Sequence, residues 1–401
     1  KAKYKILSDG TLKLVEEGKR GNDLVLNIDI ELQKKVEEIL DEEIIKTKSQ
    51  MNTKYYDKSF VVVEDPSNGE VLAMAGRKAI KKNGEYKTID FTSGILTNPM
   101  TVGSVVKGAS ILVGYNQKAI DIGDFFYDSC IKVKATTQKC SWKNLGRIND
   151  IEALAMSSNV YQFKTAMKVA GYNYSYNMAF QVDQSVFDLY RNMYHSFGLG
   201  VKTGIDLPLE SLGYSGLDNQ SGLLLDFVMG QYETYTPIQL SQYISTLANK
   251  GTRYAPRLLK EVHKSTNSSQ LSDLLYKSEK EELNQVSSEE KYINRVHEGF
   301  YAVMHASYGI GHDYIDEKYD PAGKTGTSQS FLDTNLDGII DTETISTAFI
   351  GFAPFDDPKM TITVTSPDIS YEKSRYAYTA NTTKRISKKV SDFYFSLYPN
   401  S

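Results

Sequence analysis

The sequence predicts an α+β fold, because two β-hairpins near the ends of the chain enclose a long helical middle. The first hairpin joins residues 60–64 and 71–75 through the turn formers DPSNG. The second joins 347–353 and 360–365 through PFDDP. Residues 100–310 between them are rich in helical periodicity. We therefore expect an antiparallel sheet built from distant parts of the chain, with a helical subdomain inserted.

Composition and charge are those of an ordinary globular protein. The 401 residues are 40% hydrophobic and 24% charged, with a formal net charge of −4. No basic stripe is interleaved with aromatic residues, which argues against nucleic acid as a partner. No apolar run approaches the roughly 18 residues that a membrane-spanning helix requires.

The first elements suggest a fragment of a larger protein followed by one main domain. Residues 1–22 are polar, begin without Met and carry no signal peptide, so we interpret them as the remnant of an upstream non-catalytic dimerisation region. The main domain is predicted at 23–401. It opens with a short strand and a helix that Asp29 caps. The apolar positions on one face of this helix are Leu32, Val36, Ile39, Leu40 and Ile44.

Three later segments complete the predicted elements. Residues 257–297 are charged and read as helical, with a solvated face. Residues 322–328 alternate small residues and threonines, which predicts a strand that another group approaches closely. Residues 384–398 form an amphipathic pattern that closes the chain with a helix.

One lysine stands out among apolar neighbours in TVGSVVKGASILVGY. Lys107 follows Ser104 by three residues, so on a helix the amine and the hydroxyl share a face and can hydrogen-bond. A serine becomes a good nucleophile only when a base takes its proton, and the apolar surroundings favour an uncharged lysine. By itself the S-x-x-K pattern is better explained by a lysine that extends along a helix face, because the pattern is common by chance.

Two further segments strengthen the catalytic interpretation. Ser157-Ser158-Asn159 separates two helical patterns, and Lys324-Thr325-Gly326-Thr327 lies in the predicted strand before the C-terminal hairpin. Alone, the first could be a helix cap and the second a turn. Together with Ser104 and Lys107 they match, in order, the S-x-x-K, S-D-N and K-T-G signature of penicillin-binding proteins and related β-lactamases, with Ser158 in place of the middle Asp.

From Asp23 onward the sequence resembles the transpeptidase domain of class B penicillin-binding proteins. Besides the three motifs, the similar segments are DLVLNIDIELQ, DPSNGEVLAMAG, FGLGVKTGIDLPLE, TPIQLSQYISTLANKG and STAFIGFAPFDDPKMTITV. The resemblance implies a five-stranded antiparallel sheet covered by helices, an all-helical subdomain, and an active site between them. It also implies a catalytic domain held outside the cell membrane by a single N-terminal helix that lies upstream of this sequence.

The resemblance implies a role for each motif residue. Ser104 would be the acylated nucleophile and Lys107 its general base. Ser157 would relay a proton to the departing D-alanine amine, Asn159 would bind the substrate backbone, and Lys324 would attract the substrate carboxylate and depress the pKa of Lys107.

The K-T-G strand would complete the substrate site. Thr327 and Thr325 would bind the substrate carboxylate, and Gly326 would let a peptide lie against the strand. The backbone N–H groups of Ser104 and Thr327 would form the oxyanion hole.

The implied function is a peptidoglycan D,D-transpeptidase that needs no cofactor for catalysis. Its partners would be stem peptides ending in D-Ala-D-Ala, an acceptor amine, β-lactams, and a glycan polymerase within a morphogenesis complex. The alternatives are a D,D-carboxypeptidase or β-lactamase-like hydrolase, and a β-lactam-sensing receptor domain. Two segments depart from the family pattern and put local geometry in doubt: NPMTVGS before the nucleophile, and NLGRIND where a His-Gly pair is common.

The two cysteines form either a disulfide or part of a metal site. Cys130 and Cys140 close a short loop, and a disulfide suits an extracytoplasmic domain. The other interpretation is a structural zinc site in which Asp128 and a histidine such as His195 complete the ligands.

The segment FLDTNLDGIIDTET suggests a calcium loop. Asp333, Asn335, Asp337 and Asp341 occupy positions 1, 3, 5 and 9, and Gly338 occupies position 6. Position 12 is Thr344 instead of the usual glutamate. A plain acidic turn at a hairpin tip explains the same residues.

Overall fold

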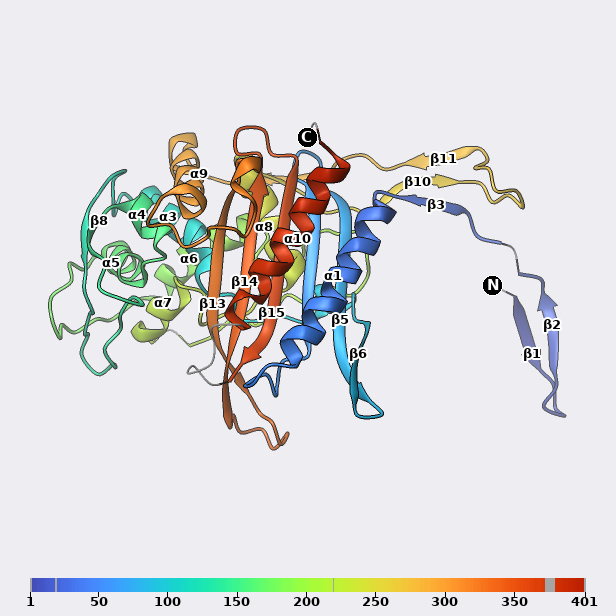
Figure 1. The fold of residues 1–401 in the computed structure, drawn as a ribbon, viewed down its shortest axis with the longest axis horizontal. Coiled ribbons are helices and arrows are strands. Elements are labelled where there is room, and N and C mark those ends of the chain that lie inside the picture. The colour runs from blue at the N-terminus through green and yellow to red at the C-terminus, as the bar shows by residue number, and fades with distance from the viewer. Residues whose placement is uncertain (1, 19, 219, 372–378, 400–401) are drawn as a thin grey trace.

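The computed structural model describes residues 2–18, 20–218, 220–371 and 379–399 and confirms the α+β fold (Figure 1). Its centre is an antiparallel sheet with the strand order β13-β14-β15-β4-β5-β6. The strands are β4 (Lys58–Asp65), β5 (Glu70–Lys82), β6 (Glu85–Asp90), β13 (Ala322–Leu332), β14 (Thr342–Ala353) and β15 (Met360–Ser370). Both predicted hairpins are present, and they join where β15 pairs with β4, for example Thr363 opposite Val62.

The sheet has six strands, one more than expected. The additional strand, β6, pairs with the second half of β5, which is longer than predicted. A tight turn at Asn83-Gly84 connects them, and both residues have positive φ angles, 54° and 87°. An Asn-Gly pair between two strands is a strong hairpin signal. The sequence therefore contained a signal for β6 that our prediction overlooked.

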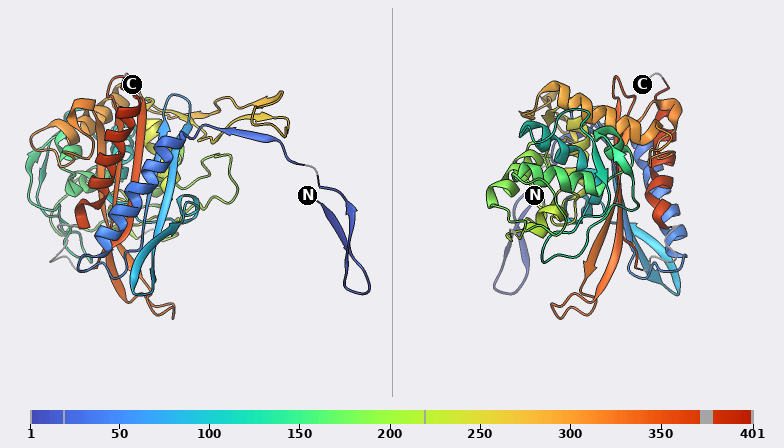
Figure 2. Two further views of the ribbon diagram at one scale, coloured as in Figure 1. Left: turned by 45° about the vertical axis from the view of Figure 1, so that its right-hand side comes forward. Right: turned by 90° about the vertical axis from the view of Figure 1, so that its left-hand side faces the viewer.

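Two long helices cover one face of the sheet. They are α1 (Ile30–Lys48) and α10 (Thr382–Leu397), which lie in front of the sheet in Figure 1. The Asp29 side chain caps α1 by accepting hydrogen bonds from the N–H groups of Glu31 and Leu32. All five predicted apolar positions of α1 are buried. Helices α1 and α10, which are far apart in the sequence, therefore pack together on this face, as Figure 2 also shows.

The opposite face carries the helical subdomain. Helix α8 (Pro237–Ala248) packs on β4 and β15, and α9 (Glu290–His305) packs on β13. The other helices here are α2 (Gly94–Thr97), α3 (Lys107–Asn116), α4 (Asp150–Ala155), α5 (Asn159–Val169), α6 (Gln184–Ser196) and α7 (Ser221–Phe227), with the small hairpin of β7 (Phe126–Asp128) and β8 (Gly146–Ile148). The largest apolar core of the described residues joins these helices to β13 and β14.

The predicted helix over 257–297 is wrong except at its end. The segment contains β10 (Leu259–His263), β11 (Leu274–Lys277) and β12 (Glu282–Gln285), and helix α9 starts only at Glu290. Strand β10 pairs with β3 (Asp23–Leu26), and β12 pairs with β9 (Thr252–Tyr254). Pairing with a strand more than 230 residues away overrides the local preference of a charged segment, which periodicity alone does not reveal.

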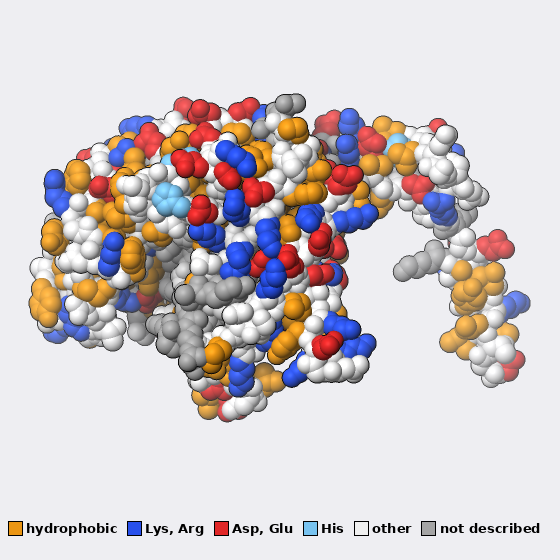
Figure 3. All heavy atoms as spheres, in the orientation of Figure 1, with side chains coloured by type: hydrophobic (Ala, Val, Ile, Leu, Met, Phe, Trp, Pro, Cys, Tyr) orange, Lys and Arg blue, Asp and Glu red, His pale blue; other side chains and the backbone are white. Residues whose placement is uncertain are grey.

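The first residues form a separate hairpin of β1 (Lys3–Ile6) and β2 (Leu12–Glu16). Every residue of both strands is exposed, and the hairpin projects away from the sheet (Figure 1). Among the described residues, no helix combines the length and hydropathy needed to cross a membrane. Basic and acidic side chains are interspersed on the face that carries α1 and α10 (Figure 3).

Candidate active site

Ser104 lies on the short 3-10 helix η1 (Gly103–Val106), which leads directly into α3. The loop before it is pressed against β13. A Cβ atom on Gly326 would lie 2.3 Å from the carbonyl oxygen of Val102, and one on Gly103 would lie 2.4 Å from that of Thr327. Gly103 also has a φ of +60°. The predicted close approach to the strand is confirmed, but the approaching group is the chain's own loop before Ser104.

Ser157 connects α4 to α5 in a left-handed backbone conformation, with a φ of 57°. Such a conformation is uncommon for a residue with a side chain and often marks a functional site. The next residue, Ser158, caps α5 by accepting a hydrogen bond from the Tyr161 N–H. Asn159 is the first residue of α5, so the end of one helix and the start of another fix this motif.

The Lys107 amine lies fully buried beside this motif. Its Nζ donates to the Ser157 carbonyl oxygen at 2.8 Å, to Ser157 Oγ at 3.3 Å and to Asn159 Oδ1 at 2.6 Å. None of its hydrogen bonds goes to Ser104, although the two residues were expected to bond. A catalytic hydrogen bond is often long in an empty site and shortens only when substrate binds.

Burial and a second cation lower the pKa of Lys107. Desolvation is the larger cause and holds the pKa well below its usual range; the nearby Lys324 acts in the same direction, and Asp128 opposes both. Burial also lowers the pKa of Lys324, to about 7. A lowered pKa favours the uncharged form of the Lys107 amine, which is the form that a general base needs.

Lys324 brings the third motif to the same point. It is fully buried on β13, and its Nζ donates to Ser157 Oγ at 3.0 Å and to the Thr325 carbonyl oxygen at 3.1 Å. Two lysine amines therefore meet on one serine hydroxyl. The structure brings all three predicted motifs together, although they are 53 and 167 residues apart in sequence.

A cavity of about 740 Å³ lies over this cluster. Its lining includes predicted and unpredicted residues: Ser104, Ser157, Asn159, Thr325 and Thr327 from the motifs, and Lys139, Trp142, Asp226, Met229 and Gln231 besides them. Lys107 and Lys324 are buried below the lining. Residues 137–140 and Trp142 also line the cavity, so the cysteine loop forms part of the wall.

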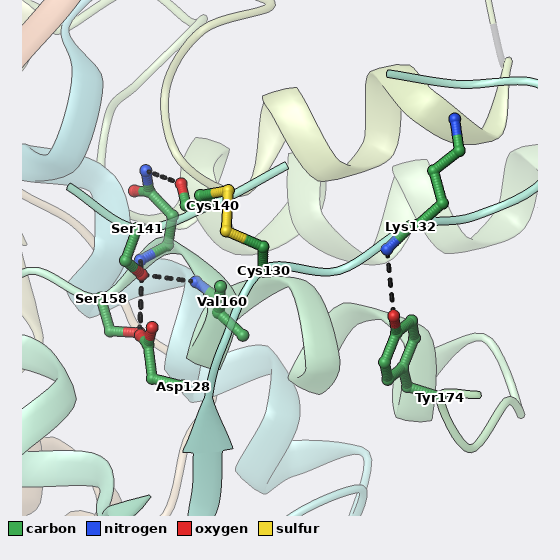
Figure 4. Close-up of a disulfide and its surroundings, with 9 residues drawn as sticks. Asp128, Cys130, Lys132, Cys140, Ser141, Ser158, Val160 and Tyr174 are labelled. Atoms are coloured by element: carbon green, nitrogen blue, oxygen red, sulfur yellow. Dashed lines mark hydrogen bonds between the residues drawn. A yellow bond between two sulfur atoms is a disulfide. The ribbon is translucent and has the colours of Figure 1, made fainter. Parts of the chain in front are cut away.

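The two cysteines form a disulfide, which confirms one interpretation and shows that the zinc interpretation is wrong (Figure 4). Disulfide sulfurs are not available as thiolate ligands. Asp128 instead accepts hydrogen bonds from Ser141 Oγ and Ser158 Oγ. His195 lies in α6, and no group of three or more His, Cys, Asp or Glu in the described part of the chain is placed to hold a metal ion.

At the predicted calcium loop, all of which the structure describes, no three His, Cys, Asp or Glu side chains are placed to hold a metal ion. The carboxylate of Asp333 accepts from the N–H groups of Asp337 and Gly338, and that of Asp341 accepts from Thr334. Asn335 donates to Asp337. Position 12 of the pattern, Thr344, is buried in β14 and bonds to Asp368. The structure supports the alternative, an acidic turn at the tip of the β13–β14 hairpin.

Sequence reasoning missed three polar residues near the site. Ser141 bonds to Asp128 and to the start of α5, Trp142 donates its indole N–H to the Met156 carbonyl oxygen, and Asp226 pairs with Lys139 in the cavity wall. The residue types carry no motif of their own. Ser141 and Trp142 follow Cys140, and Asp226 lies in the short helix α7, and neither position predicts a role in a site. Their contacts depend on how the cysteine loop folds back toward the cavity.

Comparisons with known proteins agree with this geometry. The family described as penicillin binding protein transpeptidase domain matches residues 59–389. The chain is 43% identical over 388 residues to penicillin-binding protein 2A of Bacillus subtilis, covering 96% of the chain and 53% of that protein. It is 25% identical over 419 residues to peptidoglycan D,D-transpeptidase MrdA of Haemophilus influenzae, covering 94% of the chain and 56% of that protein.

A solved structure shows the same fold. Penicillin-binding protein 2B of Streptococcus pneumoniae strain R6 superposes with a TM-score of 0.84 at 27% identity, covering all of this chain and 64% of that one. The chain spans little more than half the length of the curated relatives it matches. Because the family match covers most of the residues and includes all three motifs, the chain belongs to the penicillin-binding protein transpeptidase family.

Proposed function

We propose that this domain is a peptidoglycan D,D-transpeptidase that works through a serine acyl-enzyme and is inhibited by β-lactams. The observation that carries the proposal is the buried Lys107 amine, held between Ser157 and Asn159 below the cavity that Ser104 lines. The Haemophilus influenzae relative is named for the same activity, peptidoglycan D,D-transpeptidase.

In the acylation step, Ser104 Oγ attacks the carbonyl carbon between the two terminal D-alanines of a stem peptide. The serine proton passes to the uncharged amine of Lys107 as the new C–O bond forms. The tetrahedral intermediate then collapses, and the C–N bond to the terminal D-alanine breaks. Ser157 Oγ, which contacts the amines of both Lys107 and Lys324, delivers its proton to the leaving nitrogen and takes up the proton that Lys107 received from Ser104, so Lys107 is uncharged again.

In the second step, an acceptor amine from a neighbouring stem peptide attacks the ester carbon on Ser104. Lys107 accepts a proton from the attacking nitrogen and returns it to Ser104 Oγ as the C–O bond of the ester breaks, so the cross-link forms and both residues end in their starting protonation states. This ping-pong scheme needs no metal or organic cofactor.

Binding groups surround the nucleophile. Thr325 and Thr327 line the cavity beside Lys324 and provide hydroxyl donors for the terminal carboxylate, and Asn159 provides an amide for the substrate backbone. The backbone N–H groups of Ser104 and Thr327 form the proposed oxyanion hole. Loss of one such donor typically costs about 3–4 kcal/mol of transition-state stabilisation.

The decisive experiment is intact-mass spectrometry after incubation with benzylpenicillin. We expect one added drug mass, located by peptide digestion on the segment that holds Ser104, and no addition in Ser104→Ala. An adduct on another serine would contradict the assignment. Heat-denatured protein serves as the control for non-specific acylation.

The hydrolase and sensor alternatives differ in what happens to the acyl-enzyme. A hydrolase needs a carboxylate free to activate water near Ser104. Among the described residues lining the cavity the carboxylate is Asp226, and Lys139 holds it in an ion pair. A transpeptidase should transfer the acyl group of a D-alanyl thioester substrate to an added D-amino acid faster than to water. A hydrolase would release only the free acid, and a sensor would not turn over.

The disulfide supports our proposal for the location of the domain. Disulfides persist in oxidising compartments, so Cys130–Cys140 supports a catalytic domain outside the cell membrane. The membrane anchor, the glycan polymerase and the morphogenesis complex remain predictions from the family resemblance.

A further inference from the structure

A buried carboxylate below the second motif has no part in the proposed reaction. Asp128, at the end of β7, is 1% exposed. Its Oδ2 accepts hydrogen bonds from the hydroxyls of Ser141, at 2.7 Å, and Ser158. The charged groups that face this part of the molecule are the amines of Lys107 and Lys164.

The two serines connect the Asp128 carboxylate to the start of helix α5 through hydrogen bonds. Ser141 Oγ accepts from the N–H groups of Asn159 and Val160, at 3.0 and 3.2 Å, and Ser158 Oγ accepts from that of Tyr161 at 2.9 Å. Each hydroxyl has one hydrogen, and both serines donate it to the Asp128 carboxylate. The carboxylate therefore turns the lone pairs of both serines toward the helix N-terminus, where a negative charge is also favourable.

The disulfide holds this network together (Figure 4). Cys130 follows Asp128 by two residues, and Cys140 immediately precedes Ser141, so the covalent bond ties the carboxylate strand to the serine that it orients. The Cys140 carbonyl oxygen also accepts a hydrogen bond from Asn159 Nδ2 at 3.3 Å. With its Nδ2 held there, Asn159 presents its Oδ1 to Lys107 at 2.6 Å.

We infer that Asp128, clamped by the Cys130–Cys140 disulfide, is the positioning residue that orients Asn159 and the start of α5 for acylation. It acts through Ser141 and Ser158 and does not touch the substrate. The inference rests on the proposed function, since it assigns Asp128 to that same reaction. It also makes Asp128 the negative group that opposes Lys324 at the Lys107 amine.

The test compares acylation by a fluorescent penicillin in the wild-type domain, Asp128→Asn and Ser141→Ala. The first-order acylation rate should fall about 10- to 100-fold in Asp128→Asn, as expected for a small misplacement at a reacting group. Glu43→Gln is the matched control, because Glu43 is an equally buried carboxylate that pairs with Arg385 and Lys389 on the far face of the sheet. It should acylate at the wild-type rate.

The pH profile separates positioning from loss of stability. The charged groups near Lys107 are Lys324 from β13 and Asp128 from β7, and removal of the negative charge lowers the pKa of Lys107. The acidic limb of the rate profile should therefore move to lower pH in Asp128→Asn and stay in place in Ser141→Ala. If Asp128→Asn does not fold, the rate of Ser141→Ala decides, with a fall of at least about 5-fold expected on the same grounds.

A double-mutant cycle tests the role of the disulfide. Cys130→Ser combined with Cys140→Ser should slow acylation, and adding Asp128→Asn should cost less than it does in the wild type, since both changes disturb one network. Wild-type rates and pH profiles in Asp128→Asn and Ser141→Ala would overturn the inference. Failure of the wild-type domain to acylate at Ser104 would instead overturn the proposed function.

Discussion

At the scale of single residues, the main feature of the site is that the Lys324 amine lies near the Lys107 amine, which burial has already desolvated. Lys107 and Lys324 are fully buried and share Ser157 Oγ as an acceptor. In water a lysine is protonated at neutral pH, and holding it uncharged costs about 4–5 kcal/mol. Burial lowers that cost, because it destabilises the charged form.

We predict that Lys107→Arg lowers the acylation rate at least about 100-fold, because arginine keeps the charge but cannot act as a base. Lys107→Met, which fits a buried position without a charge, should be equally inactive. Stopped-flow acylation measures the rates, and thermal melting shows that each variant is folded. A rate within a few-fold of wild type in the Arg variant would mean that Lys107 acts only through its charge.

The apolar neighbours of Lys107 predicted its burial and low pKa from sequence alone. The pattern around Lys107 did not predict its hydrogen bonds, since they go to Ser157, in the connection between α4 and α5, and to Asn159 at the start of α5 instead of to Ser104. Asp128 was noticed for the wrong reason, as a zinc ligand. Its real contacts require β7, the cysteine loop and α5 to be packed together, which no local pattern encodes.

At the scale of elements, the packing of α8 on the sheet buries an acid. Glu64 on β4 is 1% exposed, and its carboxyl accepts from Ser245 Oγ of α8 at 2.7 Å. Burial raises the pKa of Glu64 to about 7. Between about pH 4.5 and 7 the unfolded chain loses this proton and the folded chain keeps it, so stability falls as the pH rises through this window.

We predict that Glu64→Gln removes this pH dependence. The free energy of unfolding of the variant relative to wild type should rise by about 3 kcal/mol between pH 4.5 and pH 8, from a pKa shift of roughly 2.5 units. Urea titrations at both pH values measure the difference. A constant difference across this range would mean that Glu64 is ionised in the folded protein.

The disulfide is the second element-scale feature with a measurable effect. Thiol titration of denatured, unreduced protein should find no free thiol, and elemental analysis should find no zinc. Reduction should lower the free energy of unfolding by about 3 kcal/mol, the loop-closure value for a loop of this length. Two titratable thiols before reduction would contradict the disulfide.

Apart from the β5–β6 hairpin, whose local Asn-Gly signal was overlooked, element prediction succeeded where the signal was local and failed where it was not. Helix α1 was predicted from its cap and apolar face, and the two outer hairpins from their turns. The strands β10, β11 and β12 were missed because their charged sequences are held by partners such as β3. The structure brings the three predicted motifs together, and sequence could identify them because such motifs restrict residue type more tightly than packing does.

At the scale of the whole molecule, the fold is closed by pairs of segments that are far apart in the sequence. Strand β4 pairs with β15, α1 packs on α10, and β3 pairs with β10. The site lies at the β13 edge of this sheet, where the helical subdomain meets it. A change that disrupts one of these long-range pairs should therefore also disturb the site, because the sheet connects them. A change in an element outside these pairs should leave the site unaffected.

The final prediction tests where the folded domain begins. The strands β1 and β2 pair only with each other among the described elements, and all their residues are exposed. Removing residues 1–18 should leave the free energy of unfolding within about 0.5 kcal/mol of the uncut chain, as for surface changes, and leave acylation unchanged. Removing residues 1–27 takes away β3, exposes the edge of β10 and deletes the Asn27 contacts to Arg257 and Leu259, so this variant should melt at a lower temperature. Differential scanning calorimetry of the two truncations gives the comparison. Equal destabilisation by both cuts would place the domain boundary before residue 18 and contradict the boundary predicted at residues 22 and 23.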